Sequence, residues 1–148
     1  MKEQMTSLIS FYINKEVFAF DTLKVRNILE FGQYTNVPNV KEYLLGVINL
    51  NGNIIPIADL RVMMGVDVIE NTQDTAIIVV SDDGKTDSLI GFVVDGVKEV
   101  FDMDLAALQE SVFNGNSGLI NTFIGSVYRG EDFIHVIDLV ECVQEVEK

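Results

Sequence analysis

The sequence predicts a mainly β protein built from two similar β units in tandem. Two observations carry this prediction. Short runs rich in Val, Ile and Phe recur along the chain between turn residues such as Asn, Asp and Gly, which is typical of antiparallel strands. The second half of the chain also repeats much of the pattern of the first half, and an internal repeat indicates a repeated unit of supersecondary structure.

Four pairs of apolar runs predict four β-hairpins. In each pair, two strand-length runs flank a short polar segment. Asn51-Gly52 shows the chemistry of such a segment, because Asn and Gly tolerate the positive φ angles that a tight turn demands. The paired runs are 8–13 with 17–20, 45–50 with 54–58, 76–80 with 89–94, and 123–128 with 133–137.

Helical signals are few and short. We expect a turn or two of helix after Asp21, and a short helix over 59–64 that Gly65 ends. A tail helix is predicted over 138–147, because its apolar residues recur with the helical period and would pack on the body of the protein. These apolar residues are Leu139, Val143 and Val146.

The internal repeat aligns two pairs of segments. Gly46–Leu60 can be laid without gaps on Gly125–Leu139, and identical residues coincide at four places. A second match pairs 20–29 with 92–101, so the second copy carries a longer loop near 111–117. We therefore expect a single domain over 1–148 that contains two pseudo-repeats, at about 6–66 and about 74–140, followed by the tail helix.

The size of the repeats predicts that they pack against each other. A unit of about 60 to 70 residues has a marginal core when it stands alone. Two such units gain by sharing apolar surface, and the seam between them would then be a groove with apolar walls. Clefts of this kind are where binding most often happens.

Charge and composition exclude several classes of partner. The formal net charge is −13, which would repel phosphate backbones and anionic lipid head groups, so we expect no nucleic-acid partner and no direct membrane binding. The apolar runs are strand-sized, far from the run of about 20 residues that spans a bilayer, and the N-terminus lacks the apolar core of a secretion signal. The single cysteine, Cys142, allows no internal disulfide. We expect a cytoplasmic protein.

Five motifs follow one another along the chain: Phe18–Asp21, Val25–Leu29, Val37-Pro38, Gly46–Leu60 and Phe92–Val97, of which Gly46–Leu60 is the most specific. In this order they resemble the motifs of the CheW family of chemotaxis coupling proteins. The resemblance covers nearly the whole chain. It implies two tandem five-stranded SH3-like β-barrels packed side by side, with short helices and a C-terminal helix.

The resemblance also implies a function. Members of this family are non-catalytic adaptors that couple the cytoplasmic tips of methyl-accepting chemoreceptors to the regulatory domain of a CheA-type histidine kinase. The groove between the barrels would take the receptor tip, and the barrel ends would join the kinase, in receptor arrays at the inner face of the membrane. The resemblance assigns partner binding to six residues: Val25, Asn27, Ile28, Gly46, Asn51 and Val97.

Two of these six residues depart from the family pattern. Relatives often have Glu at the position of Asn27 and Arg at the position of Asn51, placed to form an ion pair beside the groove. Both positions are Asn here, so one substitution is expected to accommodate the other through hydrogen bonds between the two amides. The alternative for Asn51 is simple turn chemistry, because Asn before Gly suits a hairpin.

The residues that could suggest chemistry have structural explanations. The only histidine, His135, lies in an alternating strand without a nucleophile motif, and Cys142 lies among apolar residues, where a small buried thiol is usual. We therefore predict no catalytic set, no metal site and no cofactor. The remaining acidic candidates are expected to be turn residues or helix caps. They are Asp82-Asp83, Asp102, Asp104, and the matched pair Asp59 and Asp138. Asp95-Gly96 is similar to half of an aspartic-protease motif, but the repeat offers no second Asp-Gly, which that chemistry requires.

Some alternatives stay open at this point. Pro56 inside a predicted strand marks either an edge or a bulge, because proline cannot donate to a ladder. A related adaptor could serve another chemosensory pathway, in surface motility or pilus control. A small-ligand-binding β-barrel is a further alternative, and it predicts one enclosed polar-lined pocket in place of a groove.

Overall fold

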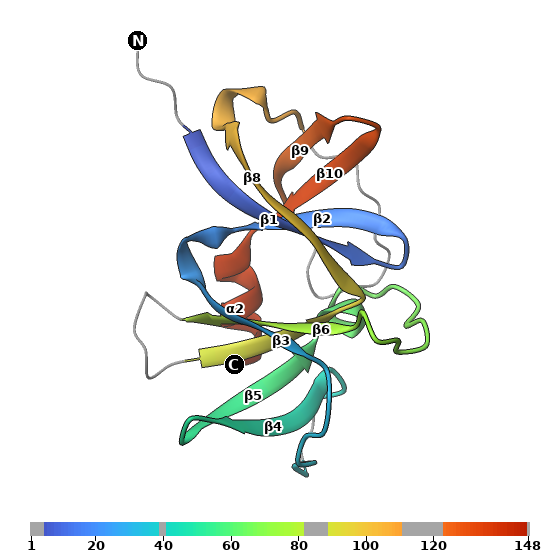
Figure 1. Ribbon diagram of the computed structural model, residues 1–148, viewed down its shortest axis with the longest axis vertical. Helices are drawn as coiled ribbons and strands as arrows, with labels where there is room; N and C mark the ends of the chain where they lie inside the picture. The colour runs from blue at the N-terminus through green and yellow to red at the C-terminus, as the bar shows by residue number, and fades with distance from the viewer. Residues whose placement is uncertain (1–4, 39–40, 82–88, 111–122, 148) are drawn as a thin grey trace.

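The computed structural model describes residues 5–38, 41–81, 89–110 and 123–147. Within these ranges the chain forms ten strands, two α-helices and two short 3-10 helices (Figure 1). The elements are β1 (Met5–Ile13), β2 (Glu16–Asp21), η1 (Thr22–Lys24), β3 (Val25–Glu30), β4 (Leu44–Leu50), β5 (Asn53–Asp59), α1 (Leu60–Met63), β6 (Ala76–Ser81), β7 (Leu89–Val94), β8 (Gly96–Asp104), η2 (Leu105–Ala107), β9 (Phe123–Arg129), β10 (Asp132–Ile137) and α2 (Leu139–Glu147).

The strands form two five-stranded sheets of the same topology, one above the other in Figure 1. One sheet has the order β8-β1-β2-β10-β9 and the other has the order β3-β6-β7-β5-β4. The mainly β fold with two five-stranded units is confirmed. The sheets nevertheless cut across the sequence repeats, because β1 and β2 pair with β8 and β10 of the second repeat, while β3 and β5 pair with β6 and β7. Each barrel thus contains strands from both repeats, and two parallel pairings join them, β2 with β10 and β5 with β7.

Each sheet closes into a barrel through an isolated bridge to its last strand. The segment after β3 bridges to β4 at Thr35 and Val47, and the segment after β8 bridges to β9 at Gln109 and Ser126. Glycine is required beneath the first bridge, because a Cβ on Gly46 would lie 2.0 Å from the carbonyl oxygen of Thr35. The matched Gly125 of the second repeat would meet the carbonyl oxygen of Gln109 at 2.7 Å.

Two of the predicted hairpins end in turns with consecutive positive φ angles. Asn14 and Lys15 have φ of 49° and 72°, and Asn51 and Gly52 have φ of 53° and 88°. Positive φ at both central residues is the geometry of a type I′ turn, which matches the twist of the flanking strands. The turn explanation for Asn51 is therefore confirmed.

Three apolar clusters form the interior of the part of the chain that the structure describes. A smaller cluster fills each barrel, one around Val127 and Ile134 and the other around Ile57 and Val79. The largest cluster lies between the barrels and includes Phe11, Phe18, Phe20, Phe92 and Met63, and α2 packs its apolar residues into it. Because the barrels exchange strands and share this core, they are expected to unfold as one unit.

The helices begin where acidic residues cap them. Asp59 Oδ1 accepts a hydrogen bond from the amide of Arg61 at 3.0 Å at the start of α1, and Asp138 Oδ1 accepts from the amide of Glu141 at 3.3 Å in α2. Gly65 follows α1 with φ of 71°, which ends the helix as predicted. The predicted apolar face of α2 is buried: Leu139, Val143 and Val146.

Pro56 does not lie in an edge strand, which was one of the two positions that the proline predicted. β5 lies between β7 and β4, so it is an inner strand. Proline is tolerated there because the parallel ladder with β7 pairs only Ile57–Asp59, so its missing N–H falls outside this ladder. The predicted turn at Asp82-Asp83 and the longer loop near 111–117 lie outside the described residues.

Candidate functional site

A groove of about 830 Å³ lies at the seam between the two barrels. Four segments form its walls: β3, the end of β1 with the turn after it, the connection from α1 to β6, and the start of β8. The groove at the seam was predicted from the repeat, but its walls mix apolar and charged side chains where apolar walls were expected. The lining residues are Tyr12, Lys15, Ile28, Leu29, Glu30, Ile69, Thr72, Gln73, Asp74, Thr75, Ala76, Asp95, Gly96 and Val97.

Two of the six predicted binding residues line this groove together. Ile28 comes from β3 in one barrel, and 48% of its surface is exposed. Val97 comes from β8 in the other barrel and is half-buried. Val97 is the repeat counterpart of Val25 at the start of β3, and both valines also pack against the largest apolar cluster. An exposed isoleucine on a groove wall is ready to contact an apolar partner without disturbing a core.

The other four predicted residues lie outside the groove. Val25 packs against the core between the barrels and pairs with Val80. Gly46 is buried beneath the Thr35 bridge, where its lack of a side chain serves barrel closure. Asn27 is exposed on β3, and Asn51 is exposed in the β4–β5 turn.

No hydrogen bond joins Asn27 to Asn51 among the contacts that the structure describes. The other barrel has an ion pair at the corresponding place, and the counterpart of Asn27 there is Glu99. Its carboxylate accepts hydrogen bonds from Arg129 at 3.0 and 3.3 Å across the barrel closure. Arg129 is the counterpart of Leu50, one residue before Asn51, so an ion pair at this place is compatible with the barrel geometry. The coupling between Asn27 and Asn51 stays a prediction.

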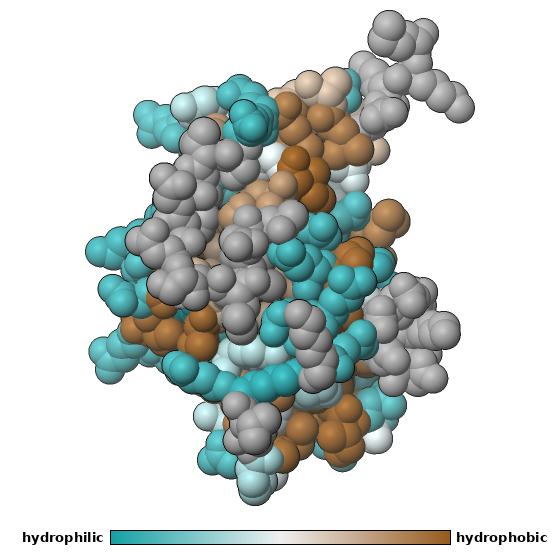
Figure 2. All heavy atoms as spheres, turned by 180° about the vertical axis from the view of Figure 1, so that it is seen from behind, coloured by the Kyte–Doolittle hydropathy of each residue, from teal (hydrophilic) through white to brown (hydrophobic). Residues whose placement is uncertain are grey.

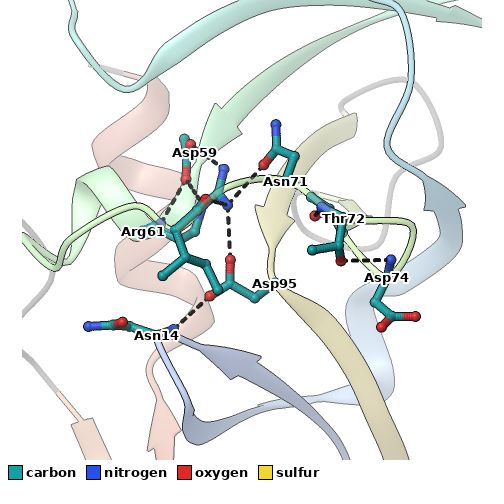
Figure 3. Close-up of polar contacts among 9 residues, drawn as sticks. Asn14, Asp59, Arg61, Asn71, Thr72, Asp74 and Asp95 are labelled. Carbon is teal, nitrogen blue, oxygen red and sulfur yellow. Dashed lines mark hydrogen bonds and ion pairs between the residues drawn. The ribbon is translucent and has the colours of Figure 1, made fainter.

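A buried ionic cluster lies behind the groove, and the sequence did not predict it (Figure 3). Arg61 of α1 is 2% exposed, and its guanidinium binds both oxygens of Asp59, with Nε–Oδ1 of 2.9 Å and Nη2–Oδ2 of 2.8 Å. Its Nη1 donates to Asp95 Oδ1 at 2.9 Å and to Asn71 Oδ1 at 3.1 Å. The repeat gave no signal for this burial, because the counterpart of Arg61 in the second repeat is Val140, which is exposed.

The charge of Arg61 is stabilised where it lies. Burial by itself would lower the pKa of the guanidinium, but the hydrogen bonds and charges of Asp59 and then Asp95 outweigh burial and raise that pKa above its ordinary value. Removing water from three charges is costly, and only a complete set of partners offsets that cost. The guanidinium of Arg61 therefore keeps its charge in the interior.

The two residues with soft or basic ligand atoms take structural roles. His135 is 6% exposed in β10, its Nδ1 lies 3.2 Å from Ser126 Oγ, and burial lowers the pKa of its imidazole. Cys142 is fully buried in α2, and burial, followed by the nearby charges of Glu141 and Asp138, raises the pKa of its thiol. A buried thiol with a raised pKa is a poor nucleophile.

Within the described ranges, no three His, Cys, Asp or Glu side chains gather closely enough to hold a metal ion. Among the same residues, no helix has the length and apolar character needed to cross a membrane.

Comparisons with known proteins identify relatives that match most of the chain. A sequence model described as the CheW-like domain matches residues 7–147. The chain is 30% identical over 118 residues to the chemotaxis protein CheW of Helicobacter pylori, covering 78% of this chain and 70% of that protein. It is 31% identical over 100 residues to Protein PilI of Pseudomonas aeruginosa, covering 68% of this chain and 53% of PilI, so it spans about half the length of that relative.

The fold has a relative among solved structures. The crystal structure of the scaffolding protein TtCheW from Thermoanaerobacter tengcongensis superposes with a TM-score of 0.76 at 26% sequence identity, covering 90% of this chain and 88% of that chain. The family match spans nearly every residue from β1 to α2, the same elements that build the two barrels and the groove between them. The chain therefore belongs to the CheW-like domain family.

Proposed function

We propose that this chain is a non-catalytic adaptor that couples chemoreceptors to a CheA-type histidine kinase in chemotaxis. The observation that carries this proposal is the family match over residues 7–147, which is nearly the whole chain. The proposal places the protein in the cytoplasm, in arrays at the inner face of the membrane. Two relatives support this role, because one is a chemotaxis protein and the other is a scaffolding protein.

The groove supports the receptor side of the proposal. Ile28 and Val97 face it from different barrels, so a helical hairpin tip that enters the groove would contact both barrels at once. An apolar side chain of the tip could be buried against Ile28, and the charged rim residues Lys15, Glu30 and Asp74 would fix its orientation. Contacts of this kind, with an apolar centre and a polar rim, are typical of specific protein interfaces.

The ends of the barrels support the kinase side of the proposal. Ile54 at the start of β5 is 63% exposed, and Tyr128 at the end of β9 is 64% exposed, so each barrel presents a large apolar side chain beside a hairpin turn. Tyr128 also packs against Phe133, with ring centroids 4.5 Å apart and the rings tilted by 38°. Figure 2 shows separate hydrophobic patches toward the upper and lower ends of the molecule. Two such ends suit a partner that is itself built of barrels.

Calorimetric titration tests both contacts. The chain is titrated with the regulatory domain of the CheA-type kinase, and separately with a receptor hairpin tip, both from the same organism. Micromolar affinity, on the order of −8 kcal/mol, is expected for each contact. An absence of heat with the kinase domain at high micromolar concentration would refute the proposal.

A matched pair of variants assigns the receptor contact to the groove. Ile28→Glu places an unpaired charge on the groove wall and is expected to weaken receptor binding by about tenfold or more, while kinase binding is retained. Val100→Glu is the control, because Val100 is the repeat counterpart of Ile28, is 58% exposed and lies outside the groove. Equal losses in both variants would contradict the assignment.

The match to PilI supports an alternative within the same class of adaptor. In that alternative the chain serves another chemosensory pathway, in surface motility or pilus control. The two are separated by testing receptor tips and kinase domains from each pathway of the organism against the chain, since the true partner set should bind at least about tenfold more tightly.

A further inference from the structure

Arg61 lies behind the groove and connects to three of its four walls. It does not line the groove itself, so it does not contact a partner there. We propose that Arg61 is a positioning residue, which holds the groove walls in register and thereby sets the affinity of the groove for its partner. This inference rests on the proposed function in one respect only, namely that the partner is the receptor tip.

The first wall is held through Asp95, which lines the groove at the corner between β7 and β8. Arg61 Nη1 donates to Asp95 Oδ1 at 2.9 Å, and the side chains of Arg61 and Asp95 are 2% and 7% exposed. A carboxylate that is buried against a guanidinium is restricted to one rotamer. The backbone of Gly96 and Val97, which continues the wall, is therefore anchored to α1 on the opposite barrel.

The second wall is held through the other oxygen of the same carboxylate. Asp95 Oδ2 accepts a hydrogen bond of 2.6 Å from the amide of Asn14, in the turn after β1. The amide of Asp95 in turn donates to the carbonyl oxygen of Tyr12 at 2.9 Å. Tyr12 and Lys15 on this wall thus keep their position relative to Arg61 through a single intermediate residue.

The third wall is the connection from α1 to β6, and Arg61 binds it directly. Nη1 donates to Asn71 Oδ1 at 3.1 Å and also lies 3.5 Å from the carbonyl oxygen of Ile69 (Figure 3). The amide of Phe31, just after β3, donates to the carbonyl oxygen of Thr75 at 3.0 Å, which joins the fourth wall to this connection. All four walls therefore meet in one network.

Only arginine can serve these partners together. Its planar guanidinium presents five donors in a fixed fork, so Nε and Nη2 take Asp59 while Nη1 remains for Asp95 and Asn71. A lysine at this place would keep the charge but has a single nitrogen. We therefore expect Arg61→Lys to preserve the fold while releasing at least one wall.

A mild variant on the third wall tests the inference. Asn71 is exposed and its carbonyl oxygen accepts from Arg61, so Asn71→Ala frees the connection without unfolding the protein. Asn36→Ala is the matched control, because Asn36 is also exposed and lies outside the groove. Each variant is measured by amide hydrogen exchange and by calorimetric titration with the receptor hairpin tip and, separately, with the kinase regulatory domain.

The expected result separates positioning from general stability. Asn71→Ala should speed exchange of the 69–75 amides and weaken receptor-tip binding by about fivefold, the effect of one lost hydrogen bond, and Arg61→Lys should do more. Kinase binding should stay within about twofold, because the barrel ends do not touch this network. Asn36→Ala should change none of the three measurements.

Two outcomes would overturn the inference. Unchanged exchange over 69–75 in both Arg61→Lys and Asn71→Ala would show that the network does not hold the walls. An equal fall in receptor and kinase affinity would assign Arg61 a merely structural role. If the unmodified protein binds no receptor tip, the proposed function fails instead, and the exchange measurement alone then decides whether Arg61 positions the groove.

Discussion

Replacing Arg61 by methionine is the most informative test of the buried cluster. Methionine has a comparable length and no charge, so it fills the space while it removes every ionic contact of the guanidinium. The change leaves Asp59 and Asp95 in place, with side chains 5% and 7% exposed. Two carboxylates would then face each other in the interior without a cation.

The loss in free energy of unfolding depends on which hydrogen bonds these two carboxylates keep in the variant. Removing one partner of a buried ion pair costs about 3–5 kcal/mol in general. Asp59 keeps the backbone amide of residue 61 at 3.0 Å, and Asp95 keeps the amide of Asn14 at 2.6 Å, so the lower end, about 3 kcal/mol, is expected. For a chain of this size, about 3 kcal/mol corresponds to a fall in Tm of about 6–12 °C.

Chemical denaturation at several pH values measures the loss and identifies its cause. In the Arg61→Met variant, an uncompensated buried carboxylate gains a proton more readily in the folded state than in the unfolded state. The folded variant then binds more protons, so its stability rises as the pH is lowered from about 7 toward about 4, and the deficit relative to the wild type shrinks. Cavity formation alone would give a deficit that is independent of pH.

A compensating variant completes the test. The triple change Arg61→Met, Asp59→Asn and Asp95→Asn removes all three charges but keeps the amide oxygens that accept the two backbone N–H groups. It should recover at least about half of the lost stability, because a buried ion pair is often replaceable by a neutral set. The reasoning is refuted if Arg61→Met loses less than about 1 kcal/mol, or if its deficit does not change with pH.

Three further outcomes are expected. Val25→Glu should lower Tm, because Val25 packs on the core between the barrels. Ile28→Glu should leave Tm within a few degrees of the wild type, because Ile28 is exposed. Thermal melts followed by circular dichroism compare the two variants. A double-mutant cycle on receptor-tip affinity tests whether positions 27 and 51 are paired. Asn51→Arg alone should leave binding nearly unchanged or weaken it, and Asn27→Glu with Asn51→Arg should be tolerated. A coupling energy of zero within error would contradict the pairing of the two positions. Burial lowers the pKa of His135, so the folded protein favours the neutral imidazole. The stability contribution should therefore be full above the unfolded pKa of about 6.5 and fall as the pH drops below it. His135→Gln should flatten this part of the pH profile in urea titrations.

Local sequence chemistry determined the hairpins and the helix ends. The strands of all four predicted hairpins pair, because alternating apolar residues act over a few positions only, and positive-φ residues occur in the three hairpin turns that the structure describes. The caps at Asp59 and Asp138 follow from the same short range. The remaining strands, β3 and β8, were not recognised as separate elements, because their side chains are largely half-exposed or exposed and lack a clear alternation.

The candidate site was only partly accessible from the sequence. The repeat predicted a seam with a groove, and two of the six residues assigned to binding, Ile28 and Val97, line it. Gly46 shows why the resemblance to the family did not place the other four residues correctly in the groove. Its place in a specific motif reflects the close approach of Thr35, a contact that brings together residues eleven positions apart and that no local pattern reveals.

The sequence by itself determined that this protein is a duplicated β structure with apolar strands, capped helices and a strongly negative charge. Only the tertiary structure decided that the barrels exchange strands, because parallel pairing of β2 with β10 joins segments more than a hundred residues apart. It also decided that Arg61 is buried. A single arginine after a capping aspartate looks like a surface residue until Asp95 and Asn71, distant in the chain, are brought within hydrogen-bond reach of its guanidinium.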